Sequence, residues 1–110
     1  PAGIMHAFSG NVQLARTFVQ LGLKFSLGRS LTYKPSAKRE ELLRFIYPEH
    51  LLLETDSPDM PPIGAEPGIP NEPRNLPLNL RGAAELLGCD VAEVAEATTR
   101  NASDLFTLGL

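Results

Sequence analysis

A histidine and two acids stand at places in the sequence where such side chains could hold a metal ion. Asp56 follows the apolar run Leu51 to Leu53 and precedes Ser57-Pro58, so it lies where a buried strand opens into a loop. His6 likewise lies near the end of a strand-like run, before Ser9-Gly10. In parallel α/β folds that end of the strands binds ligands. Imidazole nitrogen and carboxylate oxygen are common ligands of zinc and other divalent metals.

Glu54 is two residues before Asp56, so the two acids share a face on a regular strand. We expect Glu54 to support the metal site by hydrogen bonding near the ligands, and a paired-carboxylate site is the alternative. His6 and Asp56 alone leave the site incomplete, because catalytic metals usually take at least three protein ligands. Both residues also have a structural explanation. Asp before Ser-Pro is common in turns, and a lone strand histidine is more often buried and bonded to a backbone carbonyl.

Other polar residues near the strand ends give weaker signals. Ser57 and Asn71 are candidate supporting or substrate-side residues, and Asn71-Glu72-Pro73 could orient a lid or form a plain turn. We expect Asp59 to be solvated and His50, at the other end of its strand, to be structural. A phosphate can be held at strand ends, where the sequence places Ser9, Gly10, Gly28 and Arg29.

Strands and helices alternate in the first half of the chain. Apolar spacing predicts strands over 3–8, 23–27 and 51–53 and helices over 12–21 and about 37–46. Asn11 is a candidate helix cap, Gly22 ends the first helix, and 29–33 is expected to be a loop. This order predicts parallel strands with right-handed crossovers. It places His6 and Asp56 at the same edge of one sheet, with one strand between them.

The second half opens with a long irregular stretch over 57–77, which holds most of the ten prolines. Loops this long in a compact domain are usually functional or disordered. Two helices are expected after it, over about 78–87 and about 91–99. Asn101 is expected to cap a last short turn that carries Leu105 and Phe106.

Bulk composition fits one soluble domain with a modest core. Ten basic and thirteen acidic residues give a net charge of −3, so no basic excess indicates nucleic-acid binding. That is weak evidence, since a metal site can hold a phosphate on an acidic protein. No apolar run is long enough to span a membrane. The single cysteine, Cys89, excludes an internal disulfide, is expected to be inert, and fits a reducing, cytoplasmic location.

Several motifs together resemble the TatD family of metal-dependent deoxyribonucleases. They are His6-Ala7-Phe8-Ser9-Gly10, the run Leu52 to Pro58, Asn71-Glu72-Pro73 and the tail over 91–106, in matching order; Asp56 to Pro61 resembles the YjjV-like branch. The resemblance implies an α/β fold, the C-terminal portion of an amidohydrolase-like (β/α)8 TIM barrel. Residues 1–110 would supply the last three parallel strands with their flanking helices. A full barrel needs about 250 residues, so the N-terminal part is expected to be absent.

The resemblance also implies roles for single residues. His6 would be a metal ligand at the end of the sixth strand, and Asp56 a metal ligand and general base at the end of the eighth. The family's other ligands, a His-x-His pair, a Glu and a further His on earlier strands, have no counterpart in this chain. The intact protein would hydrolyse the phosphodiester bonds of DNA, using water activated by two divalent ions such as Zn, Mg or Mn.

Two other interpretations remain open. One is a hydrolase of the same superfamily that acts on an ester, amide or lactone, and the other is an inactive fragment that lacks the remaining ligands. Three parallel strands alone would leave two bare sheet edges, which invite pairing with another chain. We therefore expect DNA or another phosphodiester as the partner, no membrane, and association of the fragment when it is made alone.

Overall fold

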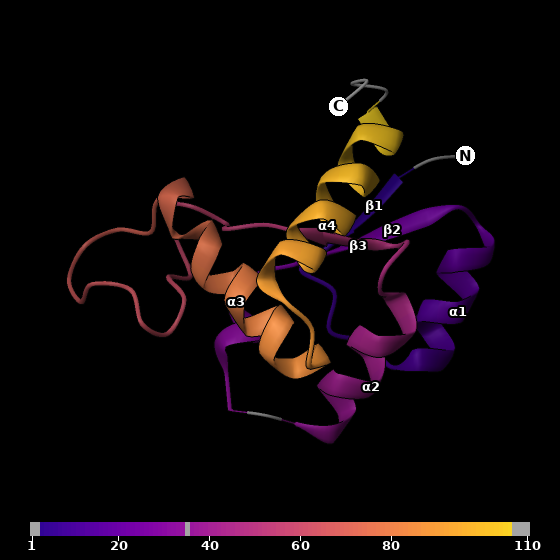
Figure 1. Cartoon of the computed structure of the whole chain (residues 1–110), viewed down its shortest axis with the longest axis horizontal. Helices are drawn as coiled ribbons and strands as arrows, with labels where there is room; N and C mark the ends of the chain where they lie inside the picture. The colour runs from indigo at the N-terminus through magenta and orange to yellow at the C-terminus, as the bar shows by residue number, and fades with distance from the viewer. Residues whose placement is uncertain (1–2, 35, 107–110) are drawn as a thin grey trace.

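Three parallel strands form the centre of the structure, a computed structural model that describes residues 3–34 and 36–106. The strands pair in the order β1-β2-β3, as Figure 1 shows. Their bounds are β1 (Gly3–His6), β2 (Leu23–Leu27) and β3 (Leu51–Leu53). The connecting helices are α1 (Val12–Gln20) and α2 (Ala37–Ile46). The parallel sheet expected from the alternation, with β2 between the outer strands, is confirmed.

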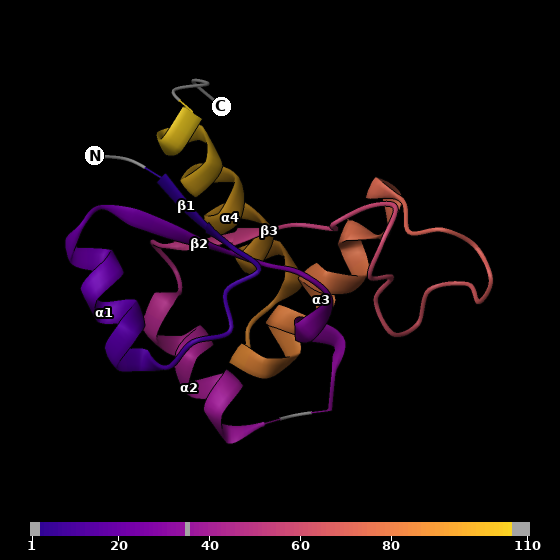
Figure 2. The ribbon, with the colours of Figure 1, turned by 180° about the vertical axis from the view of Figure 1, so that it is seen from behind.

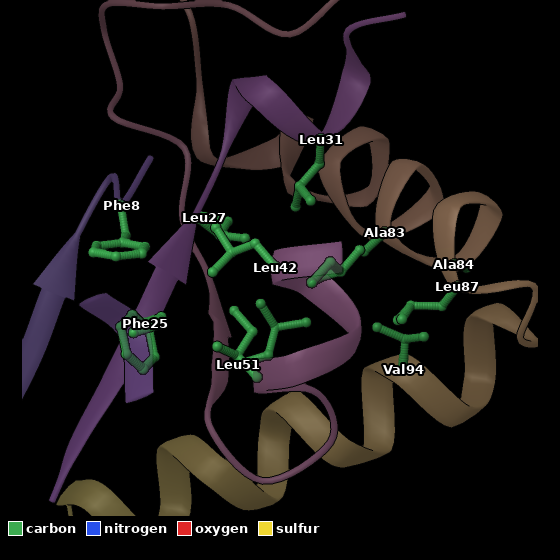
Figure 3. Close-up of a cluster of buried hydrophobic side chains, with 13 residues drawn as sticks. Phe8, Phe25, Leu27, Leu31, Leu42, Leu51, Ala83, Ala84, Leu87 and Val94 are labelled. Atoms are coloured by element: carbon green, nitrogen blue, oxygen red, sulfur yellow. The ribbon is translucent and has the colours of Figure 1, made fainter. Parts of the chain in front are cut away.

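The strand register gives the sheet two different faces. Met5, Phe25 and Leu51 lie side by side in one row, and Phe25 and Leu51 are fully buried. This face packs on side chains from all four helices to form the hydrophobic core, part of which Figure 3 shows. Burying a side chain of this size stabilises the fold by about 1.5–3 kcal/mol. The next row, of His6, Ser26 and Leu52, lies on the opposite face and carries the polar groups.

The ends of the first elements follow from local chemistry. Asn11 caps α1, because its side chain accepts a hydrogen bond from the Leu14 N–H at 2.8 Å. β1 is shorter than the expected strand over 3–8, since Ala7 takes a left-handed backbone with φ of 50° and turns the chain out of the sheet. The expected loop over 29–33 was wrong in part, because Arg29–Thr32 form a 3₁₀ helix, η1.

A long loop after β3 projects from the rest of the molecule, as Figures 1 and 2 show. It ends in a short 3₁₀ helix, Pro73–Asn75, that leads into α3 (Leu76–Leu87). The irregular stretch is therefore shorter than the expected 57–77. Pro77 lies in the first turn of α3, where its missing N–H costs no hydrogen bond. No helix among residues 3–34 and 36–106 has the length and apolar character needed to cross a membrane.

The last helix, α4 (Val91–Phe106), is continuous, so the expected break at Asn101 was wrong. Asn101 is 3% exposed and does not cap a new turn. Its amide donates to the backbone carbonyls of Pro48 at 2.6 Å and Leu51 at 2.9 Å. Because those carbonyls precede and begin β3, Asn101 fastens α4 to that strand and leaves the backbone of its own helix unbroken.

Candidate metal centre

Three side chains at or just beyond the ends of the two outer strands meet at the carboxyl edge of the sheet. His6 Nε2 lies 2.6 Å from Asp56 Oδ1 and 2.8 Å from Glu54 Oε2. One nitrogen or oxygen of each residue lies within 4.8 Å of the others. The expected proximity of His6 and Asp56 is thus borne out by these distances, and Glu54 joins them as a third possible ligand.

The central strand holds Glu54 in this cluster. Its backbone N–H donates to the Leu27 carbonyl at 3.0 Å, which extends the β2–β3 pairing by one residue. The Ser26 hydroxyl, in register with His6, donates to Glu54 Oε2 at 2.9 Å. From α3, the Asn79 amide donates to the Glu54 carbonyl at 2.8 Å. Side-chain and main-chain bonds from two elements therefore fix the position of this carboxylate.

Backbone geometry, rather than regular strand alternation, brings Asp56 to the cluster. β3 ends at Leu53, and Asp56 has a φ of 53°, in the left-handed region that is uncommon for residues other than glycine. Its carbonyl accepts from the Asp59 N–H at 2.9 Å and closes a turn. The expectation of turn chemistry at Asp56 is confirmed, and its role as a metal ligand stays a prediction. Unusual backbone of this kind concentrates at functional sites.

Burial gives Glu54 unusual electrostatics. Its side chain is 11% exposed, and Oε1 is buried with no hydrogen-bond partner among the described residues. Burial raises the pKa of this carboxyl above its usual value, and the nearby Asp56 carboxylate raises it further. The Ser26 hydroxyl, His6 and the Ala7 N–H act in the opposite direction. The unpartnered oxygen could serve as a ligand of a cation, and the cation's positive charge would offset the negative charges of the two adjacent carboxylates. This donor set therefore fits a divalent metal.

Ser26 and Asn79 are site residues that the sequence reasoning missed. Each is a polar residue inside an apolar run, one in β2 and one in α3, and both are at least nine-tenths buried. A buried polar side chain is normally hydrogen-bonded, so this placement was a usable signal for both residues.

Asn71 and Ser57 hold the loop that carries Asp56. Asn71 is 2% exposed, and its amide nitrogen donates to the Thr55 carbonyl and to the carbonyls of Asp59 at 2.9 Å and Met60 at 3.3 Å. The Ser57 hydroxyl donates to Thr55 Oγ1 at 2.9 Å. These contacts hold the loop and none of them reaches the side chains of His6, Glu54 or Asp56, which favours the supporting role for both.

The weaker candidates divide between the two ends of the sheet. His50 lies at the far end, where its carbonyl accepts from the Phe25 N–H at 2.7 Å. Asp59 is exposed, as expected. Ser9 and Gly10 line a pocket at the near end. Cys89 is half-buried, and its thiol lies 3.8 Å from the Leu87 carbonyl.

Comparison with known proteins identifies the family. The family described as TatD related DNase matches residues 1–107. An Escherichia coli protein named uncharacterized metal-dependent hydrolase YjjV is 38% identical over 106 residues, which are 96% of this chain and 40% of the relative. Human deoxyribonuclease TATDN3 is 35% identical over 103 residues, 94% of this chain and 36% of the relative. The chain thus spans about two fifths of the length of these relatives.

Solved structures agree with the expected fold. The crystal structure of Escherichia coli YjjV, a TatD homolog, superimposes with a TM-score of 0.81 at 38% identity, over 94% of this chain and 39% of that one. A TatD family hydrolase from Entamoeba histolytica gives a TM-score of 0.78 over 94% of this chain and 42% of that one; at 16% identity it bears on the fold alone. The three parallel strands and their helices are confirmed as the C-terminal portion of a (β/α)8 barrel. This chain belongs to the TatD family.

Proposed function

We propose that this chain is the C-terminal part of a metal-dependent hydrolase that cleaves the phosphodiester bonds of DNA. The observation that carries this proposal is the convergence of His6 Nε2 with carboxylate oxygens of Glu54 and Asp56 at the carboxyl edge of the sheet. In barrel enzymes the active site lies at that end. The names of the relatives, metal-dependent hydrolase in Escherichia coli and deoxyribonuclease in human, support the reaction class and the substrate.

The three side chains would form part of a site for two divalent ions. When bound, such ions supply a water activated for attack and a Lewis acid for the phosphoryl oxygen. His6 offers Nε2 and the two acids offer oxygens, a mixed donor set that suits zinc or manganese better than magnesium, which prefers oxygen alone. Further ligands would come from earlier strands of the barrel, outside this chain.

Asp56 has the best position for proton transfer. Its side chain is 14% exposed and stands beside the imidazole of His6. One carboxylate oxygen faces His6 Nε2, so the second can accept the proton of the attacking water. Glu54, held by Ser26 and Asn79, is positioned to keep its buried oxygen on the metal.

The proposal is tested first by metal content and DNA cleavage. The 110-residue chain is compared with the full-length protein, meaning a protein of barrel length that contains it. We expect the full-length protein alone to hold about two ions and to cut DNA, since each catalytic metal takes at least three protein ligands and this chain offers only the group of His6, Glu54 and Asp56 among its described residues. Cleavage of esters, amides or lactones but not of DNA would favour the other hydrolase. Metal binding and DNA cleavage by the short chain alone would contradict the barrel-fragment assignment.

Substitution of Asp56 tests its catalytic role. Asn is among the residues that best tolerate positive φ, so Asp56→Asn should keep the loop conformation and lose only the charge. We expect turnover in the full-length protein to fall by about 10²–10⁴-fold, the usual size of a general-base contribution, with unchanged thermal stability. Asp59→Asn, an exposed acid in the same loop, is the matched control and should leave turnover unchanged. Near-normal turnover of Asp56→Asn would contradict the role.

A further inference from the structure

A single hydrogen bond fastens the projecting loop to η1. The Ile63 N–H donates to Oγ1 of Thr32, the last residue of η1, at 2.9 Å, and the neighbouring Pro62 is buried. Among the described residues, this is the only hydrogen bond that joins residues 59–70 to a part of the chain outside 55–71. Thr32 is thus the polar anchor of the loop that carries Asp56.

The Thr32 hydroxyl is oriented for this bond by its own element. It donates its proton to the Arg29 carbonyl at 2.7 Å, one turn earlier in η1. A hydroxyl has one proton and two lone pairs, so a lone pair remains to accept the Ile63 N–H. Thr32 therefore holds Ile63 in a defined direction from η1, which begins two residues after β2 ends.

Side-chain packing does little to hold the loop beside this bond. A cavity of about 400 Å³ lies between the loop, η1 and α3, and Thr32, Ile63, Gly64 and Leu78 are among the residues that line it. The Ile63 side chain is 58% exposed. Even a Cβ added at Gly64 would lie 3.8 Å from its nearest neighbour, in the Leu78 side chain. The path of the chain at Ile63 and Gly64 therefore depends on the hydrogen bond to Thr32.

Two residues between β3 and this anchor have left-handed backbone. Asp56 has a φ of 53° and Met60 a φ of 49°, and both conformations cost free energy because neither residue is glycine. Such residues persist only where surrounding contacts over-determine them. Asn71 supplies one restraint, through the Met60 carbonyl at 3.3 Å. Thr32 supplies another, three residues further along at Ile63. Without the second restraint Met60 is free to relax, and the segment that carries Asp56 loses its fixed far end.

We propose that Thr32 is a positioning residue for the metal site, whose hydroxyl holds the loop so that the Asp56 carboxylate stays beside His6. The inference rests on the proposed function in taking Asp56 as a metal ligand. The two hydrogen bonds of Thr32 go to Arg29 and Ile63 and not to the clustered side chains, so its effect passes through the loop. A loop released from η1 places Asp56 beside His6 for less of the time, which weakens metal binding while the fold remains.

Zinc binding tests the inference without catalysis. Zinc is titrated calorimetrically into the full-length protein carrying Thr32→Val, which keeps the shape of the side chain and removes the hydroxyl. We expect zinc affinity to fall by about 3–10-fold, the change in population that one hydrogen bond supports, because the loop leaves η1 more often. Thr32→Ser keeps the hydroxyl and should restore most of the wild-type affinity, and a Ser variant as weak as Thr32→Val would contradict the role of the hydroxyl.

Thr98→Val is the matched control. The Thr98 hydroxyl also donates to carbonyls one turn earlier, those of Val94 at 2.9 Å and Ala95 at 3.2 Å, and Thr98 is half-buried like Thr32. Both of its partners lie within α4, so this variant loses a hydroxyl without releasing the loop and should bind zinc as the wild type does. Zinc affinity that is unchanged in Thr32→Val, or lowered equally in Thr98→Val, would overturn the inference.

Hydrogen exchange shows where the structure loosens. In the metal-free full-length protein, we expect the amides of residues 63–66 to exchange faster in Thr32→Val than in the wild type. The amides of α4 should exchange alike in both, because local opening of a loop leaves the protected helices closed. Weaker zinc binding with unchanged exchange in the loop would show that Thr32 does not act through the loop, and would overturn the inference.

DNA cleavage separates this inference from the proposed function. A wild-type protein that binds zinc and cuts DNA, with a Thr32→Val variant of equal zinc affinity, would keep the hydrolase and overturn the positioning role. A wild-type protein that binds zinc but cuts no DNA, with weaker zinc binding in Thr32→Val and not in Thr98→Val, would contradict the nuclease and support the positioning role. A wild-type protein that binds no zinc would overturn both.

Discussion

The amide of Asn71 ties together a loop that carries a candidate ligand. Its nitrogen bonds carbonyls at Thr55, Asp59 and Met60, which flank Asp56 on both sides. Its oxygen accepts from the Asn75 amide at 2.9 Å, which anchors the loop to the turn before α3. Asn71 touches none of the three clustered side chains in these bonds, so it acts on the site by positioning Asp56.

Removing this amide should loosen the metal site. In Asn71→Ala the three carbonyls lose their donor from the buried Asn71 side chain, and loss of such hydrogen bonds costs about 1–3 kcal/mol. We expect lower thermal stability and a metal affinity of the full-length protein reduced by about 10–100-fold, the usual effect of a residue that orients a ligand. Calorimetric titration with zinc measures it. Glu66→Ala, at an exposed position in the same loop, is the control. Unchanged zinc affinity in Asn71→Ala would reduce Asn71 to a purely structural residue.

His50 gives the fold a pH dependence at the other end of the sheet. Burial lowers the pKa of this imidazole below its usual 6.5, and the nearby Lys24 charge lowers it further, while Glu49 opposes both. The folded state therefore favours neutral His50. Its contribution to stability is fully present above pH 6.5 and is lost as the pH falls through the lowered value.

Replacement of His50 should reduce the loss of folding stability that accompanies a fall in pH. We expect the free energy of unfolding of the wild type to fall more between about pH 7.5 and about pH 5 than that of His50→Gln, because only the wild type gains a proton at this position on unfolding. Urea unfolding at both pH values measures the difference. An equal decrease in the two proteins would show that His50 titrates alike when folded and unfolded.

Sequence reasoning found the ligand candidates but not the residues that position them. His6 and Asp56 were predictable because each ends an apolar run, and parallel strands bring such ends to one edge. Ser26 and Asn79 act through partners distant in the chain. Their contribution depends on strand register and on the placement of α3, which local patterns do not contain.

α3 and the 3₁₀ helix η1 meet at a glycine. A Cβ added at Gly82 would lie 2.2 Å from the Leu31 carbonyl oxygen, and Figure 3 shows Leu31 against α3. Leu31 is 2% exposed, so this backbone has little room to move. In an exposed helix, alanine would be preferred over glycine by about 1 kcal/mol. Here the close approach of the two elements reverses that preference.

Gly82→Ala should therefore destabilise the protein. Forcing an extra carbon into a packed contact costs about 1–3 kcal/mol, which exceeds the gain in helix propensity. Gly88→Ala is the control, since Gly88 has a φ of 68° and open space around it; its cost should be only the roughly 1–2 kcal/mol of left-handed backbone. Urea unfolding compares the two variants. A Gly82→Ala protein as stable as the wild type would contradict the close contact.

Local sequence patterns predict some helix boundaries correctly and others wrongly. The start of α2 and the cap of α1 were predictable because Ser36 and Asn11 bond the backbone just after them. Asparagine also led to a wrong prediction, because Asn101 was expected to cap a new turn and α4 instead continues through it. Its side chain bonds Pro48 and Leu51, fifty or more positions earlier, so it interrupts nothing. A capping residue can be recognised from sequence only where no tertiary partner competes for its side chain.

The order of the sheet leaves β1 and β3 at its margins, each with one side that no strand pairs among residues 3–34 and 36–106. Ile4 on β1 is 40% exposed. We expect the 110-residue chain, made alone, to associate increasingly with concentration, because unpaired strand edges accept strands of other chains. Light scattering over a concentration series measures this.

A charge on the edge strand should oppose that association. Ile4→Lys is expected to lower the mean mass in solution, because lysine on an edge strand disfavours pairing. Ile63→Lys, in the projecting loop where Ile63 is 58% exposed, is the control and should change little. A chain that stays monomeric at all concentrations would show that its margins are protected by other means.

The overall topology was the most predictable level of structure. The alternation of strand and helix sufficed for a parallel sheet, and the motifs at 6–10 and 52–58 resembled one family across the chain. The stacking of Arg29 and Arg39 on Tyr33 was not predictable in the same way. Arg29, Tyr33 and Arg39 span a loop, a 3₁₀ helix and a helix, and only their folded arrangement stacks both guanidiniums on one ring.

The register of the sheet has a consequence for how such a chain can evolve. His6 pairs with Ser26, and Leu27 pairs with Leu53. The position of the metal site along the strands is therefore set by the strand register and not by the lengths of the helices between the strands. Insertions in the connections over 7–22 and 28–50 can be absorbed by turns without moving the site. Loss of one residue between Gly3 and His6 would turn the imidazole to the helix-covered face. The connections are therefore free to vary in length, while the strands can change only by substitution.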